Sequence, residues 1–356
     1  RPERAVSTLR SGGAGLLVEA NVAARDVALA LHIEPGETVA LLGPNGAGKS
    51  TLLGVLAGSL RDEASRVELG DRVLAGRAAW VPPHGRGVGL LAQDPLLFPH
   101  LSVLANVAFG PRSGGAGRAA ASEIARTWLA RVGCAELADR RPSQISGGQA
   151  QRVALARALA ADPAVVLLDE PMGALDVDAR PALRHLLREV LRDRTAVIVT
   201  HDVLDALLLA DRVVVLEDGR VVEDGPTAEV LTRPRSAFAA RVAGLNLLAG
   251  RWASGVLVGE RSVSGRPHDG LEEGGAAVAA FRPAAVSVYR RAPEGSPRNA
   301  WPVTVDALEP QGDLVRVRAG ALSALVTPQA VAELDLEPGV PAVFVVKAVE
   351  VEVYPR

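Results

Sequence analysis

Residues 39–51 read VALLGPNGAGKST, and this stretch decides the fold. Its first four residues are an apolar run between a Pro-Gly turn and a glycine-rich segment, which is the pattern of a buried strand. Residues 50–60 follow with the apolar spacing of a helix. A strand, the spacing G-x-x-x-x-G-K-S and a helix in this order predict a loop that cradles phosphate groups. Glycines let backbone N–H groups curl around phosphate oxygens, and the helix N-terminus adds partial positive charge.

The side chains of this loop predict the ligand. Lys49 is expected to reach the β- and γ-phosphates of a nucleotide, and Ser50 to ligate Mg²⁺. A glycine-rich turn with a stray lysine is the alternative, but the chain has only one other lysine, Lys347, so chance explains this lysine poorly. The residues expected to hold the nucleotide in this segment are Gly43, Pro44, Asn45, Gly46, Ala47, Gly48, Lys49, Ser50 and Thr51.

A second apolar run ends in two carboxylates, since residues 165–171 read VVLLDEP. In open α/β sheets, ligands bind outside the carboxyl ends of the strands. We therefore expect Asp169 to hold Mg²⁺, as the acidic strand end does in phosphate-loop NTPases, and Glu170 to be the general base for an attacking water. A strand that merely ends in a polar turn is the alternative, and the phosphate loop upstream makes it the weaker one.

Further short motifs complete a recognisable set. A serine and two glycines at positions 146–148 precede a helix, where they form a second anion cradle, although taken alone they are an ordinary N-cap. Together with the phosphate loop and the acidic strand end, these motifs resemble the ATP-binding-cassette (ABC) ATPases over about residues 16–238. The motifs besides the loop and the strand end are Gln93 in LAQD, Ser146, Gly147, Gly148 and Gln149, Asp176 in GALD, and His201 in VTHD.

The resemblance implies an α/β P-loop ATPase that works as a head-to-tail homodimer. The Ser146–Gln149 turn of one copy would close on ATP held by the Gly43–Ser50 loop of the other, and Asp176 would act across the interface. Gln93 would contact Mg²⁺ and the attacking water. His201 would hydrogen-bond the γ-phosphate. The resemblance thus makes Glu170, His201 and Gln93 the catalytic residues, and Ser50, Gln93 and Asp169 the metal ligands.

One departure from the family concerns the nucleobase. The family usually has an aromatic residue ahead of the phosphate loop that stacks on adenine, whereas residues 1–42 contain no Phe, Trp or Tyr. Either Arg25, through its guanidinium plane, or Val27, as an apolar surface, is expected to cover the base instead. This leaves the choice between ATP and GTP open. The same lack resembles the molybdate-importer branch of the family.

The pattern changes after about residue 238. Short alternating strands punctuated by glycine and proline predict a small all-β barrel. Residues 302–356, with Phe281-Arg282-Pro283, resemble the oligonucleotide-binding-like (TOBE) barrel that ends many importer ATPases. We interpret it as a regulatory or dimer-stabilising module, with direct anion sensing as the alternative. The expected organisation is an ATP-binding domain at 1–238 with a helical subdomain at about 94–160, a linker at 239–247, and the β domain at 248–356.

Composition excludes several classes of protein. The chain has 356 residues, 48% of them hydrophobic, and a net charge of −2. This balance fits a packed globular protein and argues against a dedicated nucleic-acid binder. A single cysteine, Cys134, excludes a disulfide scaffold and a cysteine-based zinc cluster. No apolar run approaches the ~18 residues of a membrane span, so any membrane role must go through a partner.

We therefore interpret the chain as the ATP-hydrolysing subunit of an ABC importer, peripheral to the cytoplasmic face of a bacterial membrane. The resemblance implies integral-membrane permease subunits and an extracytoplasmic solute-binding protein as partners. Molybdate or a similar oxyanion is the expected solute, and sulfate, ferric iron, polyamine or sugar are the alternatives. A non-transport ABC ATPase of nucleic-acid metabolism is more distant, because the sequence lacks the long coiled coils or zinc cysteines of such relatives.

Overall fold

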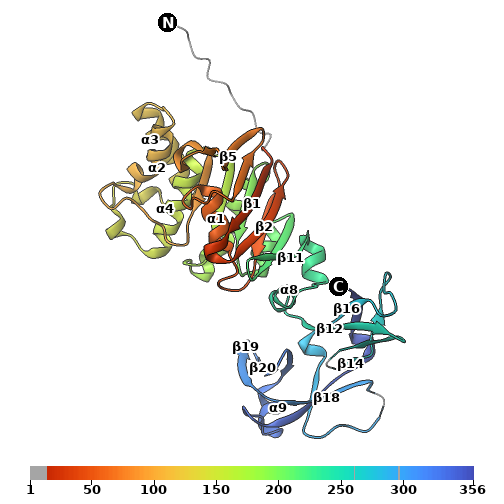
Figure 1. Ribbon diagram of the computed structural model, residues 1–356. Coiled ribbons are helices and arrows are strands. Elements are labelled where there is room, and N and C mark those ends of the chain that lie inside the picture. The colour runs from red at the N-terminus through yellow and green to blue at the C-terminus, as the bar shows by residue number, and fades with distance from the viewer. Residues whose placement is uncertain (1–13, 260, 296) are drawn as a thin grey trace. The chain divides into compact units, whose positions relative to one another are not determined.

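The computed structural model describes residues 14–259, 261–295 and 297–356 (Figure 1). The chain divides into two compact units between Ala228 and Glu229, ahead of the boundary expected at residue 238. Residues just after the division belong to the second unit because they bond to its far end: the Tyr354 hydroxyl donates to the Pro234 carbonyl at 2.8 Å. Residues 1–13, which the expected first domain includes, lie outside the described residues.

A six-stranded sheet forms the centre of the first unit, and all its neighbouring strands run parallel except one pair, Arg212–Glu217 with Arg220–Pro226. Consecutive side chains of its buried strands point to opposite faces, so Val165 and Leu167 join one apolar cluster and Val166 and Leu168 the other. The strand order is β11 (Arg220–Pro226), β10 (Arg212–Glu217), β3 (Thr38–Leu42), β9 (Thr195–Val199), β8 (Val165–Asp169) and β7 (Val88–Leu91).

An antiparallel sheet and one helix supply the apolar cluster that covers one face of the central sheet. The helix is α1 (Lys49–Ala57), which buries Leu52, Val55 and Leu56. The antiparallel strands alternate buried and more exposed residues, as β1 (Leu16–Val22) does over its whole length. Their order is β2 (Val27–Ile33), β1 (Leu16–Val22), β4 (Arg66–Leu69), β5 (Arg72–Gly76) and β6 (Ala79–Trp80).

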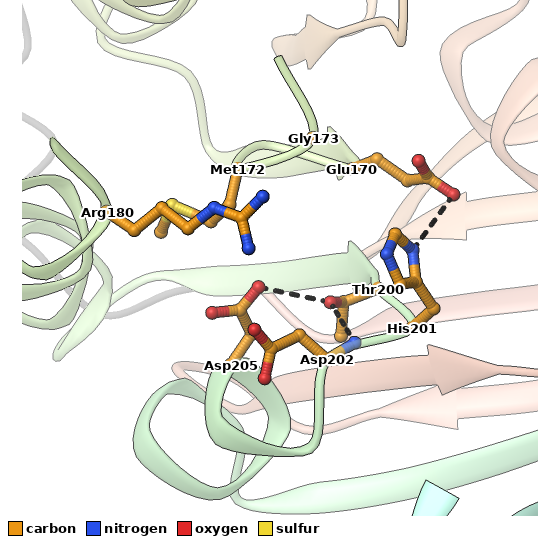
Figure 2. A pocket seen from close by; sticks show the side chains of 8 residues that line it. All are labelled: Glu170, Met172, Gly173, Arg180, Thr200, His201, Asp202 and Asp205. Atoms are coloured by element: carbon orange, nitrogen blue, oxygen red, sulfur yellow. Dashed lines mark hydrogen bonds and ion pairs between the residues drawn. The ribbon is translucent and has the colours of Figure 1, made fainter. Parts of the chain in front are cut away.

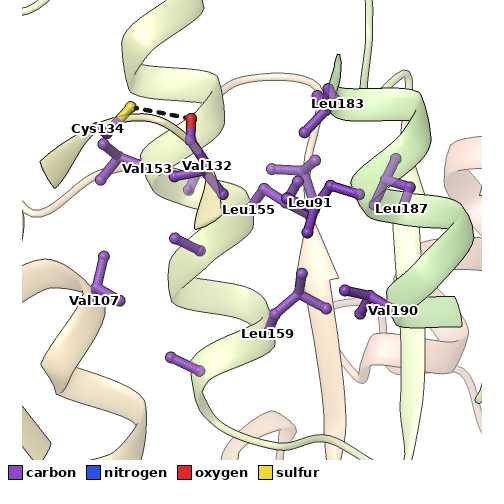
Figure 3. Close-up of a cluster of buried hydrophobic side chains, with 14 of the residues drawn as sticks. Leu91, Val107, Val132, Cys134, Val153, Leu155, Leu159, Leu183, Leu187 and Val190 are labelled. Carbon is purple, nitrogen blue, oxygen red and sulfur yellow. Dashed lines mark hydrogen bonds between the residues drawn. The ribbon is translucent and has the colours of Figure 1, made fainter. Parts of the chain in front are cut away.

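Helices supply the other cluster. Figure 3 shows Leu155 and Leu159 of α4 (Gly147–Ala160) between Val107 of α2 (Val103–Ser113) and Leu187 of α5 (Arg180–Leu191). The helix α4 thereby joins the central sheet to the helical region that α2 and α3 complete, and the residues of all three fall within the range expected for a helical subdomain. The helices of this unit beyond α1 are α2 (Val103–Ser113), α3 (Arg118–Arg131), α4 (Gly147–Ala160), α5 (Arg180–Leu191) and α6 (Val203–Leu209).

A proline lies inside α2, since the helix continues through Pro111 to Ser113. Proline lacks the N–H that would bond one turn back, which disfavours it inside a helix. Pro111 is buried, and the apolar contact offsets the missing bond. The glycines that follow, Gly114 and Gly115, then end the helix.

The second unit is built mainly from short antiparallel strands around their own apolar core, which includes Trp301 and Phe344. The stretch 239–247, expected as a linker, lies largely in α8 (Ala237–Val242) and the first residues of β12 (Asn246–Ala253). The other helices are α7 (Thr227–Thr232), which crosses the division, and α9 (Pro328–Glu333). The three sheets comprise β14 (Ser262–Val263), β13 (Val256–Val258), β12 (Asn246–Ala253), β16 (Ala276–Phe281), β23 (Glu352–Pro355) and β15 (Arg266–Pro267); β17 (Ser287–Tyr289), β22 (Pro341–Val346) and β18 (Asn299–Thr304); and β19 (Ala307–Gln311), β20 (Leu314–Ala319) and β21 (Leu322–Val326).

Across the described residues, we find no helix with the length and apolar character that crossing a bilayer requires.

Candidate functional site

The glycine-rich segment lies between the end of β3 and the start of α1. Gly48 precedes the helix with a φ of 99°, a conformation that side chains rarely adopt, and a Cβ there would lie 2.8 Å from Val27 Cγ2. Only glycine therefore lets the loop turn into the helix so close to β2. This geometry aims the first N–H groups of α1 at the space inside the loop, where an anion would be stabilised.

The Lys49 ammonium folds back over the loop. Its Nζ donates to the Gly43 carbonyl at 2.7 Å and to the Pro44 carbonyl at 2.8 Å. Partial burial lowers the pKa of Lys49, while the charges of Glu170 and Asp169 oppose that shift. The one lysine of this unit thus lies between the loop and the two carboxylates.

Two carboxylates stand where β8 ends. Asp169 is the last residue of the strand and hydrogen-bonds with Ser50. Burial, followed by the negative charge of Glu170, raises the pKa of Asp169, and Lys49 and the Ser50 bond only partly compensate. A cation in contact with Asp169 would relieve both unfavourable effects.

Glu170 is held on strained backbone. Its φ is 49°, in the left-handed region that non-glycine residues rarely adopt. The strain is held by hydrogen bonds on both sides: the Glu170 N–H donates to the Val199 carbonyl at 3.0 Å, and the Gly173 N–H donates to the Glu170 carbonyl at 3.0 Å. Such strain often marks functional positions, because folding alone would not select it.

Gln93 and His201 approach the same site from two other strands. Gln93 follows β7 and lines a cavity with the phosphate loop, and His201 follows β9. Figure 2 shows the imidazole of His201 facing the Glu170 carboxylate, with Nδ1 3.5 Å from Oε1. Four parallel strands, β3, β7, β8 and β9, therefore deliver these side chains to one edge of the sheet, as their shared direction requires.

The cavity at this edge has a volume of about 380 Å³. It combines backbone donors, a lysine and two carboxylates, which is a donor set suited to a phosphate chain with a divalent cation. Neither the 146–149 turn nor Asp176 lines it within one chain. The residues that line it are Arg25, Asn45, Gly46, Gly48, Lys49, Ser50, Thr51, Gln93, Asp169, Glu170 and Val199.

The Ser146–Gln149 turn forms the N-terminus of α4. The Ser146 hydroxyl accepts from the Gln149 N–H at 3.3 Å, and the Gln149 side-chain oxygen accepts from the Ser146 N–H at 2.9 Å. This reciprocal capping leaves other N–H groups of the first turn pointing outward. Ser146, Gly147 and Asp176 are all exposed, so this turn offers a second anion cradle at the surface rather than within the cavity.

A network of hydrogen bonds that could not be predicted from the sequence lies behind His201. Arg184 of α5 donates to Asp205 Oδ1 from Nε at 2.8 Å and from Nη2 at 2.6 Å. The other oxygen of Asp205 accepts from the Thr200 hydroxyl at 3.1 Å, which in turn accepts from the Asp202 N–H at 3.1 Å (Figure 2). The residues on both sides of His201 are thereby fixed. The only sign of this network in the sequence is Asp205, an acidic residue in an otherwise apolar helix. The sequence does not indicate which residue it pairs with.

Comparison with known proteins shows which families the chain is similar to. Residues 27–173 match the model of the ABC transporter family, and residues 295–353 match that of the TOBE domain. The chain is 50% identical to the molybdenum import ATP-binding protein ModC of Mycobacterium tuberculosis, over 96% of this chain and 97% of that protein.

Two more comparisons cover mainly the first unit. The chain is 46% identical to the sulfate/thiosulfate import ATP-binding protein CysA 2 of Agrobacterium fabrum, over 68% of this chain and 71% of that protein. A solved dimeric ATP-binding cassette, in a post-hydrolysis state with ADP and phosphate bound, is similar with a TM-score of 0.54. That structure is 27% identical and covers 60% of this chain and 98% of its own.

Proposed function

This chain belongs to the ABC transporter family of ATP-binding ATPases, and we propose that it hydrolyses ATP with Mg²⁺ to drive the import of molybdate or a similar oxyanion. The observation that carries the proposal is the meeting of the phosphate loop, two carboxylates, a glutamine and a histidine at the carboxyl ends of four parallel strands. ATP binding follows from the family. The assignment of individual residues, the metal and the solute are the proposal.

In this mechanism, the loop and Lys49 bind the β- and γ-phosphates of ATP. Glu170 accepts a proton from the attacking water as the water oxygen forms its bond to the γ-phosphorus. The bond between that phosphorus and the β,γ-bridging oxygen breaks, leaving ADP and phosphate. His201 hydrogen-bonds the γ-phosphate, which stabilises the charge that spreads over its oxygens, and Gln93 orients the water.

The residues present fit a magnesium ion. Magnesium prefers oxygen ligands and is commonly bound by one or two carboxylates together with substrate phosphates. Asp169 and Ser50 already hydrogen-bond, and the pKa of Asp169 is raised by burial and by Glu170, so a cation there would be stabilised. Ser50, Asp169 and Gln93 would hold the ion, which when bound neutralises negative charge on the β- and γ-phosphates.

We assign the Ser146–Gln149 turn and Asp176 to a second copy's nucleotide. Both are exposed and neither lines the cavity of its own chain, which supports a head-to-tail homodimer that completes each site across the interface. The similar solved cassette is itself dimeric. Permease subunits would anchor the dimer to the cytoplasmic face of the membrane, with an extracytoplasmic solute-binding protein acting through the permease.

The solute is argued from the relatives. The ModC similarity extends over 96% of the chain, including the second unit, whereas the CysA 2 similarity covers 68%, which favours molybdate over sulfate. The test is uptake in a bacterial strain that lacks this gene and carries either the wild-type chain or Glu170→Gln. We expect wild-type alone to restore molybdate uptake. Unimpaired molybdate uptake without the gene, or rescue of sulfate, iron, polyamine or sugar uptake instead, would reassign the solute.

A further inference from the structure

The imidazole of His201 has few contacts of its own. Its side chain is 72% exposed, and its one hydrogen-bond or ion-pair partner among the described residues is Glu170, whose Oε1 lies 3.5 Å from Nδ1. Backbone φ and ψ limit the rotamers that a side chain can adopt. The direction of this ring therefore depends mainly on the backbone that carries it.

Thr200, the residue before His201, forms hydrogen bonds in two directions. Its side chain is buried, and its hydroxyl donates to Asp205 Oδ2 at 3.1 Å and accepts from the Asp202 N–H at 3.1 Å. A hydroxyl has one proton to donate, so the bond to Asp205 leaves its lone pairs for the Asp202 N–H. The Thr200 hydroxyl thus ties the residue before His201 to the residue after it.

Asp205 is itself held from another helix. Arg184 donates to its Oδ1 from Nε at 2.8 Å and from Nη2 at 2.6 Å. Arg184 lies on α5, which the buried side chains of Leu183 and Leu187 anchor in the core. A buried ion pair adds little net stability because desolvation offsets its attraction, but the planar fork of arginine fixes the direction of a carboxylate. The pair therefore presents Oδ2 of Asp205 to the Thr200 hydroxyl.

We propose that Thr200 and Asp205 are positioning residues for ATP hydrolysis, because their hydrogen bond holds the turn that directs the His201 ring to the reacting phosphate. The inference rests on the proposed function, since it needs His201 to act in hydrolysis. Neither positioning residue lines the nucleotide cavity, so neither contacts the substrate. They line instead a cavity of about 20 Å³ beside Glu170 and His201, which has room for about one water (Figure 2).

The test removes the Thr200 hydroxyl and keeps its shape, in Thr200→Val of the full chain. The kcat for ATP hydrolysis should fall by about tenfold, less than the ~10²-fold that a 1 Å misplacement can cost, with the KM for MgATP unchanged. Thr200→Ser, which keeps the hydroxyl, should hydrolyse at close to the wild-type rate. In a His201→Ala background, Thr200→Val should cause no further loss, because its effect passes through the ring.

Thr195→Val is the matched control. Thr195 lies at the other end of β9 and is also buried, and its hydroxyl also donates one hydrogen bond, to the Ala14 carbonyl at 3.0 Å, and accepts one, from the Gly36 N–H at 3.0 Å. Urea denaturation should show that Thr195→Val and Thr200→Val both destabilise the fold, whereas Thr195→Val should hydrolyse ATP normally. Equal losses of kcat in the two variants would make Thr200 a merely structural residue.

Arg184→Lys is a second variant, which serves if Thr200→Val does not fold. It keeps the charge and loses the fork, so it should also lower kcat, and only while His201 is present. Unchanged kcat in the folded variant, an equal loss with and without His201, or a Thr200→Ser protein as slow as Thr200→Val would overturn the inference. If His201→Ala alone hydrolyses at the wild-type rate, the role of His201 in the proposed function fails, and this inference with it.

Discussion

Glu170 and Asp205 face the same small cavity, yet they are built in opposite ways (Figure 2). The Glu170 side chain is 28% exposed, sits on left-handed backbone and has the His201 imidazole as a neighbour at 3.5 Å. Asp205 is 2% exposed, and its two oxygens accept from Arg184 and Thr200. This difference indicates which of the two carboxylates is available to react with a water. Asp205 is closed off from solvent by the partners that hold it, whereas the partly exposed Glu170 carboxylate can contact a water.

The largest expected effect comes from Glu170→Gln, which removes the free carboxylate and keeps its size. Turnover should fall by about 10²–10⁴-fold, the usual contribution of a general base, while ATP binding persists. Phosphate release and nucleotide titration measure the two properties. Glu189→Gln, on the exposed surface of α5, is the control and should hydrolyse normally. Turnover close to wild-type in Glu170→Gln would mean that another group takes the proton.

Asp205→Ala tests the other side of the comparison. It leaves Arg184, whose side chain is only 13% exposed, without its main partner. Loss of one member of a buried ion pair costs about 3–5 kcal/mol, against about 0.2–1 kcal/mol for an exposed pair. Urea denaturation of Asp205→Ala should show this loss, and Glu123→Ala, which breaks an exposed pair with Arg126 on α3, should barely change stability. Equal effects of the two substitutions would refute a structural role for Asp205.

Asp169→Asn should change the stability of the fold least. It should stabilise the protein, whereas Asp205→Ala should destabilise it. The folded protein raises the pKa of Asp169 above its ordinary 3.8, first by burial and then by the charge of Glu170. The contribution of Asp169 to folding stability is therefore fully present below pH 3.8. It is lost as the pH rises through the pKa that Asp169 has in the folded protein. At neutral pH the neutral asparagine should stabilise the nucleotide-free protein by roughly 0.5–2 kcal/mol, and the gain should shrink in acid.

The measurement for Asp169→Asn is urea denaturation at neutral and at mildly acidic pH, with Mg²⁺ and nucleotide removed. The same variant should lose magnesium-dependent ATP hydrolysis, which separates its stability from its function. Asp162→Asn, with a carboxylate that is 83% exposed, is the control and should show little difference between the two pH values. A variant less stable than wild-type at neutral pH would show that Asp169 helps the fold.

Much of the protein could be predicted from short stretches of sequence. The family and the fold class are confirmed by the matched models and relatives. The strands before Gly43 and Glu170 were predictable because each is a continuous apolar run that ends in a functional group. The course of α2 through Pro111 could not be predicted in this way, because the burial of Pro111 depends on residues far away in the chain.

The sequence by itself determined the chemistry, because phosphate binding, proton transfer and metal ligation need particular side chains at short fixed spacings, and those spacings are local. Only the tertiary structure decided how the groups work together. It paired Arg184 with Asp205, 21 positions apart in the chain, buried Val27 beneath the phosphate loop and left Arg25 at the cavity. The reason is physical: burial and hydrogen-bond partners depend on how distant segments pack, and a local pattern of residues carries no record of that packing.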